Sequence, residues 1–366
     1  MIHRLILALA AALMTVAPAA AQTTADAAVP RYAHVLVIVE ENKDYDQILD
    51  PAFAPHFAAL AAIYGNATSF FGEVHPSEAN YVALLGGDTF GIRDDDPFYC
   101  HAGLSDPLCT GAAQAGYADH TVRARHLGQQ LEAAGLTWKG YYENLPEPGS
   151  LAVIASDPAF ADGTRKTALY AAKHSGFVNF DSVQNDARRA DRLVDFKQLD
   201  ADIAADRLPS FALLVPNQCN EMHGLEGQNL PPGCSKTDMA ALVKRGDEVI
   251  ARLVSSVQAT PAWRGPDNFA IVITFDEGAG KTREGCCAVT PDAPSNFGGG
   301  HIPTIVITNH GPRHVADGAA YNHYSLLRTI EDAFGIGQHL AHAADTDKGV
   351  VPMVKLFRVK TSGRGG

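Results

Sequence analysis

Apolar runs that end in clusters of polar residues are the feature that most constrains the fold of this chain. The runs 33–39, 211–215 and 268–275 are rich in β-branched and other apolar residues, which is typical of strands buried on both faces of a sheet. A fourth run, 302–308, follows a glycine-rich segment, and a long helical pattern covers 237–258. Buried strands that alternate with helices predict an α/β fold with a largely parallel central sheet.

The 366 residues suit one large domain. We expect this domain to span residues 22–354, with loop insertions near 93–122 and 144–190 and a flexible tail at 355–366. Residues 1–21 combine a basic start, an apolar run too short to span a bilayer and an A-x-A cleavage site, the pattern of a secretory signal peptide. We therefore expect an exported protein, periplasmic or secreted.

The cysteines agree with export to an oxidising compartment. Six are present, and an even number there favours disulfides over metal thiolates. The adjacent pair Cys286-Cys287 can form a vicinal disulfide, or each cysteine can pair elsewhere. The two pairs expected first, because each closes a short loop, are Cys100 with Cys109 and Cys219 with Cys234.

The net charge of −12 limits the partners of the protein. A nucleic-acid groove needs clustered Lys and Arg, and docking on anionic lipids needs a basic surface. Beyond the leader, the sequence has no apolar stretch of about 20 residues that would span a membrane. We expect neither nucleic-acid binding nor stable membrane anchoring.

A serine lies between a predicted strand and a predicted helix. The strand at 67–71 leads into His75-Pro76, and Ser77 stands where the next helix begins. A helix N-terminus favours an anion such as phosphate, so Ser77 is a candidate nucleophile at a phosphate site. The alternative is that Ser77 only caps the helix, which is the commoner role of a serine in this position.

Polar residues at the ends of separate strands should meet, because the ligand site of an α/β sheet lies outside the carboxyl ends of its strands. Glu41, Asn42, Asp276 and Glu277 follow two of the predicted strands directly. Their oxygen atoms suit a divalent cation of unknown identity, which would stabilise the alkoxide of Ser77 and the charge on a phosphoryl group. The sequence therefore predicts metal-assisted phosphoryl transfer.

Four histidines near the same strand ends are candidates for phosphate binding and for proton transfer to the leaving group. His75, His174, His223 and His301 can contact phosphate oxygens or protonate the leaving group. For any single histidine among them, a structural role is the alternative.

Several of these segments together resemble a known family. The segments are Val37-Ile38-Val39-Glu40-Glu41-Asn42, His75-Pro76-Ser77-Glu78-Ala79-Asn80-Tyr81, Pro216-Asn217-Gln218-Cys219-Asn220-Glu221-Met222-His223, Thr274-Phe275-Asp276-Glu277-Gly278 and Tyr321-Asn322-His323-Tyr324-Ser325-Leu326-Leu327. They resemble the phosphoesterase family of bacterial acid phosphatases and phospholipases C, within the alkaline-phosphatase-like superfamily. The resemblance implies a three-layer α/β/α sandwich.

The resemblance also implies roles for individual residues. It makes Ser77 both nucleophile and metal neighbour. The implied metal ligands are Glu41, Asn42, Asp276 and Glu277; the implied phosphate contacts are His174, His223, His75, Asn80 and His301.

The compact length favours an acid phosphatase that hydrolyses phosphate monoesters of small molecules or phosphoinositides through a phosphoserine. The alternatives are a phospholipase C that cleaves phospholipid diesters, and an exported protein that binds phosphate or lipid headgroups without catalysis.

Overall fold

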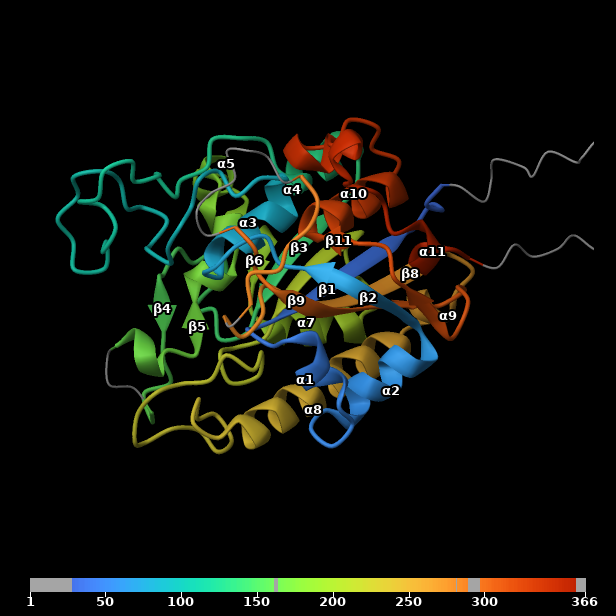
Figure 1. Cartoon of the computed structure of the whole chain (residues 1–366), viewed down its shortest axis with the longest axis horizontal. Helices are drawn as coiled ribbons and strands as arrows, with labels where there is room; N and C mark the ends of the chain where they lie inside the picture. The colour runs from blue at the N-terminus through green and yellow to red at the C-terminus, as the bar shows by residue number, and fades with distance from the viewer. Residues whose placement is uncertain (1–27, 161–163, 281, 289–296, 360–366) are drawn as a thin grey trace, which may run out of the picture.

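The computed structural model describes residues 28–160, 164–280, 282–288 and 297–359, and the predicted signal peptide at 1–21 lies outside them. A central sheet stands between two layers of helices (Figure 1). The strands are β1 (His34–Glu40), β2 (Gly65–Phe71), β3 (Trp138–Tyr142), β4 (Ile154–Ala155), β5 (Tyr170–Ala171), β6 (Leu193–Val194), β7 (Phe211–Val215), β8 (Phe269–Phe275), β9 (His301–Thr308), β10 (Val315–Asp317) and β11 (Tyr321–Asn322). The α-helices are α1 (Tyr45–Leu49), α2 (Pro55–Ile63), α3 (Glu78–Gly86), α4 (Leu127–Ala133), α5 (Asp181–Gln184), α6 (Arg189–Arg192), α7 (Phe196–Ala204), α8 (Met239–Gln258), α9 (Pro261–Arg264), α10 (His323–Ala333) and α11 (Val354–Phe357).

The sheet is parallel except for one strand. The order of its main path is β10-β2-β9-β8-β1-β7-β3-β6, with β11 beside β2. β1 pairs in parallel with β7 and β8, whereas β9 runs antiparallel to both β2 and β8. The prediction of a largely parallel α/β sheet is confirmed, and β9 is the exception that the sequence pattern did not indicate.

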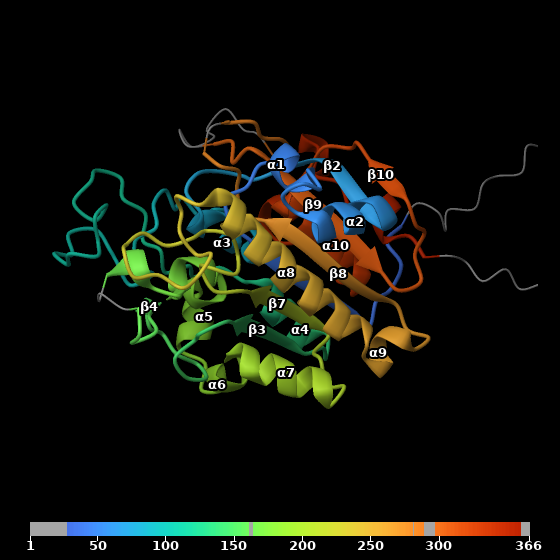
Figure 2. The same ribbon diagram turned by 90° about the horizontal axis from the view of Figure 1, so that it is seen from below.

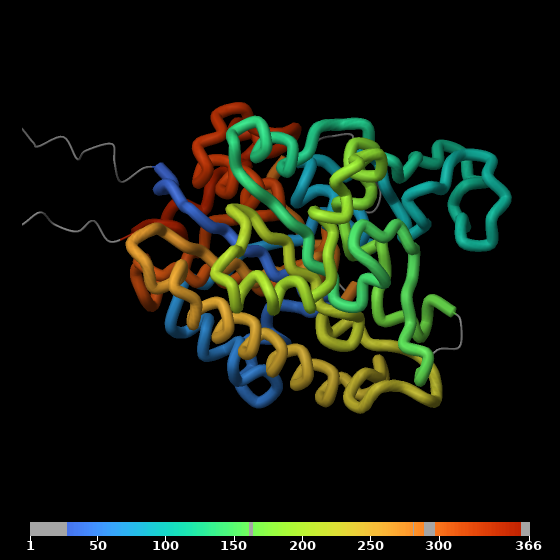
Figure 3. The backbone as a smooth tube through the Cα atoms, turned by 180° about the vertical axis from the view of Figure 1, so that it is seen from behind, coloured from blue at the N-terminus to red at the C-terminus, as the bar shows by residue number. Residues whose placement is uncertain are grey.

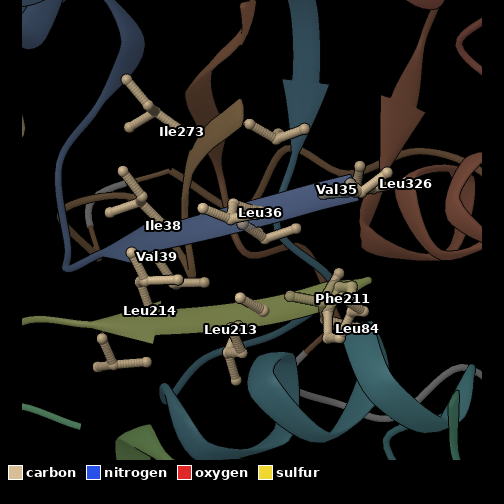
Figure 4. Close-up of a cluster of buried hydrophobic side chains, with 14 of the residues drawn as sticks. Val35, Leu36, Ile38, Val39, Leu84, Phe211, Leu213, Leu214, Ile273 and Leu326 are labelled. Atoms are coloured by element: carbon tan, nitrogen blue, oxygen red, sulfur yellow. The ribbon is translucent and has the colours of Figure 1, made fainter. Parts of the chain in front are cut away.

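Helices cover both faces of this sheet, which makes three layers. Helices α2 and α8 pack together on one face, and α3 and α10 pack together on the other (Figures 1 and 2). Strand β1 is buried from Val35 onward because β7 and β8 flank it and helices cover both its faces. Figure 4 shows the result in the core, where Leu36 of β1 and Leu213 of β7 lie near Leu84 of α3 and Leu326 of α10.

The two ends of the described chain lie side by side, at the end of the sheet away from the carboxyl ends of its parallel strands (Figure 3). The rings of Tyr32 and Phe357 pack edge to face with centroids 5.5 Å apart, and the Tyr32 hydroxyl donates to the Phe357 carbonyl. Leu356 and Phe357 are buried. The expectation of a flexible tail from residue 355 is therefore wrong for these positions, because two apolar side chains anchor α11 to the core.

The two predicted insertions consist mostly of turns and short elements, and the first extends away from the helical layers as a loop (Figure 1). Disulfides join Cys100 to Cys109 and Cys219 to Cys234. Both pairs match the expectation from loop length. The remaining pair, Cys286 with Cys287, is the vicinal alternative. Among the described residues, no helix combines the length and the apolar character that crossing a membrane requires.

Candidate active site

The parallel pairing of β1 and β8 brings two acidic segments together. Glu40 pairs with Phe275 at the ends of these strands, so Glu41 and Asp276 emerge next to each other. The backbone N–H of Asn42 donates to Asp276 Oδ1 over 3.2 Å. The carboxyl ends of two neighbouring strands thus supply the acids, as the topology of the sheet predicts.

Ser77 lies between β2 and α3 with its hydroxyl directed at these acids. Its Oγ donates toward Glu41 Oε2 at 3.1 Å and lies 3.4 Å from Glu277 Oε1. Ser77 occupies the N-cap position of α3, but its backbone is helical, with φ −53° and ψ −51°, and its side chain makes no capping hydrogen bond. The capping alternative is therefore wrong, and the hydroxyl remains available for chemistry.

Buried carboxylates surround the Ser77 hydroxyl. Glu41, Asp276 and Glu277 are 0%, 1% and 6% exposed. Burial raises the pKa of Glu41 well above its usual value, and the nearby Asp276 and Glu221 raise it further. A group of acids held this close without water requires positive charge to be stable.

The polar atoms that remain unpaired fit a cation. Within the described part of the chain, Asn42 Oδ1 and Asp276 Oδ2 are buried and have no hydrogen-bond partner. Unpaired buried oxygens are costly unless a ligand or water satisfies them. Asn42, Asp276 and the adjoining glutamates therefore form a set of oxygen donors suited to a divalent cation.

His174 and His223 lie on the other side of Glu41. His174 Nε2 is 3.3 Å from Glu41 Oε1, its Nδ1 is 2.7 Å from Glu221 Oε1, and the rings of the two histidines are 5.3 Å apart. One donor atom each from Glu41, His174 and His223 fits within 4.8 Å, a spacing at which a single cation can bind all three.

The protonation state of these histidines differs from the one predicted. Burial, and then the charge of Lys173, lowers the pKa of both His174 and His223 well below its usual value. Neutral imidazoles can bind metal or accept hydrogen bonds, but they do not begin a reaction as acids. The predicted role of protonating the leaving group therefore does not suit His174 or His223.

The pKa of His75 is shifted in the direction opposite to those of His174 and His223. His75 Nδ1 forms an ion pair with Glu277 Oε2. The hydrogen bond that His75 donates to Glu277 raises the pKa of His75. Burial raises the pKa of Glu277 to about 7, although His75 opposes this rise. Both shifts favour retention of a proton on this pair, next to the Ser77 hydroxyl.

Two predicted substrate ligands lie outside this cluster. Asn80 is 1% exposed, and its Oδ1 accepts from the N–H groups of Glu73 and Val74 while its Nδ2 donates to Val74 O. His301 Nε2 lies 3.1 Å from the Thr68 carbonyl. The contacts of Asn80 hold the Ser77 loop and those of His301 fix the start of β9, so neither side chain faces the cluster of acids.

Sequence reasoning missed a buried lysine at the centre of the site. Lys43 is 2% exposed, and its Nζ donates to the carbonyls of Glu41, Asn42 and Met222 over 3.2, 3.1 and 2.7 Å. It ties the loop after β1 to the loop after β7. Burial lowers its pKa to about 8. The only available signal was its place in the polar run after β1, where a lysine is usually solvated.

Contacts of His323 join the Ser77 loop to β8. His323, at the start of α10, forms a buried ion pair with Glu73, and its Nε2 lies 2.9 Å from the Phe275 carbonyl. Phe275 precedes Asp276. His323 therefore fixes the loop before Ser77 relative to the acids that follow β8.

Comparisons with known proteins identify the family of the chain. The model of the phosphoesterase family matches residues 48–337, most of the chain. A phosphatidylinositol-3-phosphatase of Mycobacterium tuberculosis is 28% identical over 312 residues, which cover 85% of this chain and 80% of that protein. An acid phosphatase of Aspergillus fumigatus is 26% identical over 298 residues, which cover 81% of this chain and 53% of that protein, so the chain spans about half its length.

Solved structures agree on the fold. A protein in the alkaline phosphatase superfamily from Vibrio parahaemolyticus superposes with a TM-score of 0.51 at 12% identity, covering 91% of this chain and 73% of that one. The PsFucS1 sulfatase from Pseudoalteromonas sp. superposes with a TM-score of 0.52 at 12% identity, covering 90% and 72%. The predicted alkaline-phosphatase-like sandwich is confirmed, and the chain belongs to the phosphoesterase family as a phosphoric ester hydrolase.

Proposed function

We propose that this protein is a metal-dependent phosphatase that hydrolyses phosphate monoesters through a phosphoserine on Ser77. The observation that carries this proposal is the direction of the Ser77 hydroxyl. It points away from the helix that it precedes and toward Glu41 and Glu277. A serine is a weak nucleophile, and neighbouring acceptors for its proton make it a stronger one.

The first half-reaction transfers the phosphoryl group to the enzyme. Ser77 Oγ attacks phosphorus and loses its proton to the carboxylates beside it, while the bond between phosphorus and the alcohol oxygen breaks. The leaving alcohol takes a proton from the His75–Glu277 pair, on which both pKa shifts favour a bound proton. The products of this step are the free alcohol and phospho-Ser77.

The second half-reaction uses water. A water molecule attacks phosphorus and the bond from Ser77 Oγ to phosphorus breaks. Ser77 Oγ takes back the proton that the neighbouring carboxylates received in the first step, and inorganic phosphate leaves. The His75–Glu277 pair recovers a proton from the attacking water, in reverse of its first role. Because the first step needs this pair protonated, the rate should fall as the pH rises above the pKa of His75, which accords with an acid phosphatase.

A divalent cation would be held by Asn42, Asp276, Glu277 and Glu41, with His174 and His223 on the far side of Glu41. When bound, it would lower the pKa of the Ser77 hydroxyl and neutralise charge on the phosphoryl group. Without it, the buried acids repel one another, as the raised pKa of Glu41 indicates.

We further propose that the protein is exported, which its three disulfides support. The preference for monoesters is supported by relatives named as phosphatases, one of them a phosphatidylinositol-3-phosphatase. Phosphatidylcholine hydrolysis tests the alternative of a phospholipase C. Release of phosphocholine at a rate above phosphate release from a monoester would select that alternative.

Replacement of the nucleophile tests the mechanism. Ser77→Ala should lower kcat for an aryl phosphate by about a thousandfold or more and abolish the phosphoserine that mass spectrometry detects after an acid quench. Ser255→Ala, on the exposed side of α8, is the matched control and should retain activity, because Ser255 bonds only within its own helix turn. A Ser77→Ala variant within about tenfold of the parent would refute the phosphoserine.

Metal removal tests the cofactor. Dialysis against a chelator should abolish turnover, and addition of a divalent cation should restore it. Binding of the cation should also raise the midpoint of thermal unfolding, because it binds the folded site and relieves the repulsion among its acids. Full activity after chelation would contradict metal dependence. Turnover that is lost to the chelator and restored by the cation would exclude the alternative of a non-catalytic binding protein.

A further inference from the structure

A cavity opens directly beside the histidine side of the site. Its volume is about 210 Å³, and His223, Gly224 and Gln218 form part of its wall. This volume is many times what a single water molecule needs, so the cavity can hold a group considerably larger than water. The transferred phosphoryl group must lie at Ser77, which is not part of the cavity wall. The cavity is therefore available to another part of the substrate.

Cationic side chains line the cavity at the end nearest Ser77. Lys173 directly precedes His174, and its Nζ lies 2.9 Å from Asp95 Oδ2. Asp95 Oδ1 in turn accepts from the backbone N–H of Glu78, the residue after Ser77. The ammonium group of Lys173 is thus fixed to the first turn of α3, within two hydrogen bonds of the nucleophile's own backbone.

A second lysine lies on the opposite wall. Lys236 packs its stem against Gly224, where an added Cβ would lie 3.1 Å from Lys236 Cγ. Its side chain is 37% exposed and its Nζ lies 3.8 Å from Glu226 Oε1. Burial, and then the charge of Lys173, lowers the pKa of Lys236. Lys173 and Lys236 thus both line this one cavity.

Most of the acids in the cavity wall have other partners. Glu78 pairs with His120, Asp96 accepts from Thr110 and Gly111, and Glu226 pairs with the exposed Lys166. Asp95 takes one of the three N–H donors of Lys173, and Glu226 lies 3.8 Å from the Nζ of Lys236, so each ammonium group keeps donors for an anion. Arg165 also lines the cavity and donates to the carbonyls of Asp95 and Leu108. The apolar part of the wall consists of Pro97, Phe98, Val153, Ile154, Ala171 and Ala172.

We propose that this cavity binds a second phosphate group, carried on the alcohol portion of the substrate, with Lys173 and Lys236 as its ligands and the apolar wall against the intervening carbon atoms. The proposal rests on the proposed function, since Ser77 must take the first phosphate. It makes the enzyme selective for bisphosphorylated alcohols over simple monoesters.

A matched pair of substrates tests this selectivity. Hexanediol bisphosphate and hexyl phosphate share the scissile ester and the carbon chain and differ in the second phosphate. In the parent enzyme, kcat/KM for hexanediol bisphosphate should exceed that for hexyl phosphate by about tenfold or more, which is the effect of one or two charge-assisted hydrogen bonds. In Lys236→Ala the ratio should fall to about threefold or less. Lys236→Arg, which keeps the charge, should restore it.

The control variant is Lys244→Ala, which removes an exposed lysine from α8 and should keep the full ratio. Dioctanoyl phosphatidylglycerol phosphate carries the second phosphate on a lipid. A preference for it over hexanediol bisphosphate that disappears in Lys236→Ala identifies a lipid headgroup as the source and supports the site. A preference that persists in that variant would overturn the proposal, because acyl chains would then account for it.

Binding provides a readout that does not depend on turnover. The Ser77→Ala variant, with its metal added, should bind hexanediol bisphosphate about tenfold more tightly than hexyl phosphate by calorimetry. Equal affinities would overturn the second-phosphate site while leaving the phosphatase mechanism intact. Turnover by Ser77→Ala within about tenfold of the parent, with the affinity difference preserved, would instead refute the phosphoserine mechanism and leave the second-phosphate site standing.

Discussion

Asn80 provides a sharp test of the difference between a loop support and a substrate ligand. Its carboxamide accepts from two consecutive backbone N–H groups, those of Glu73 and Val74, over 3.0 and 3.2 Å, and donates to Val74 O over 3.0 Å. All of these atoms lie in the loop that carries Ser77. Replacing Asn80 with Ala should therefore disrupt the loop before it affects any contact with substrate.

The size of the effect follows from the burial of the donors. Glu73 and Val74 are 2% and 1% exposed. Each buried N–H left without an acceptor costs about 1–3 kcal/mol. Partial entry of water reduces the sum, so Asn80→Ala should lower the free energy of unfolding by about 3 kcal/mol. Asn80→Asp keeps one acceptor oxygen but turns a second oxygen toward the carbonyls of Val74 and Pro76, so its loss should be at least about 1 kcal/mol.

Urea unfolding and steady-state kinetics together decide between the two roles. In the support role, Asn80→Ala loses stability, and the amides of Glu73 and Val74 exchange faster with deuterated solvent. Any loss of activity then appears mainly in kcat, because Ser77 is misplaced. A substrate ligand would give a raised KM with stability within about 0.5 kcal/mol of the parent, and that result would refute our account of Asn80.

Three further perturbations test other parts of the structure. Lys43→Met, which removes three buried hydrogen bonds while keeping the apolar stem, should lower the free energy of unfolding by about 3 kcal/mol, and an unchanged urea midpoint would contradict the bridging role of Lys43. Burial lowers the pKa of His126 to about 3 from a reference value of 6.5. This ring stays neutral in the fold while the unfolded chain takes up a proton below about pH 6.5, so stability present at higher pH is lost as the pH falls, by up to about 1.4 kcal/mol per pH unit. His126→Asn, which can still cap α4, should flatten that loss in urea titrations between about pH 6.5 and 4.5, and an identical slope in parent and variant would exclude His126 as its source. Replacing Cys219 and Cys234 together by Ser should cost about 3 kcal/mol, since their bond closes a loop with a sequence separation of 15, and should also weaken metal binding measured by calorimetry, since that loop carries His223.

Much of the fold was predictable because strands that are buried on both faces appear in the sequence as continuous apolar runs. β1 and β8 are apolar along almost their whole length, and the polar residues after them mark the edge where the strands end. Parallel pairing then brings Glu41 next to Asp276 whatever their separation in the chain. The loop lengths also predicted two of the disulfides.

The parts that could not be predicted depend on side-chain direction and on solvent exclusion. Asn80 and Ser77 lie three residues apart on the same segment, yet one carboxamide turns back to its own loop and the other side chain faces the acids. From its sequence context Lys43 is expected at the surface, whereas in the structure its Nζ donates to three backbone carbonyls. The neutral state of His174 follows from burial beside Lys173, which no local pattern reveals.

The distances along the chain between the groups that meet at Ser77 have a consequence for biosynthesis. Its oxygen contacts partners 36 and 200 positions away, and the link between Asn42 and Asp276 spans 234. A fragment that stops short of β8 lacks Asp276 and Glu277, so we expect a partly synthesised chain to be inert toward phosphate esters. Recovery of turnover during refolding should accordingly be among the last events observed, and it would serve as a reporter that β1 and β8 have paired.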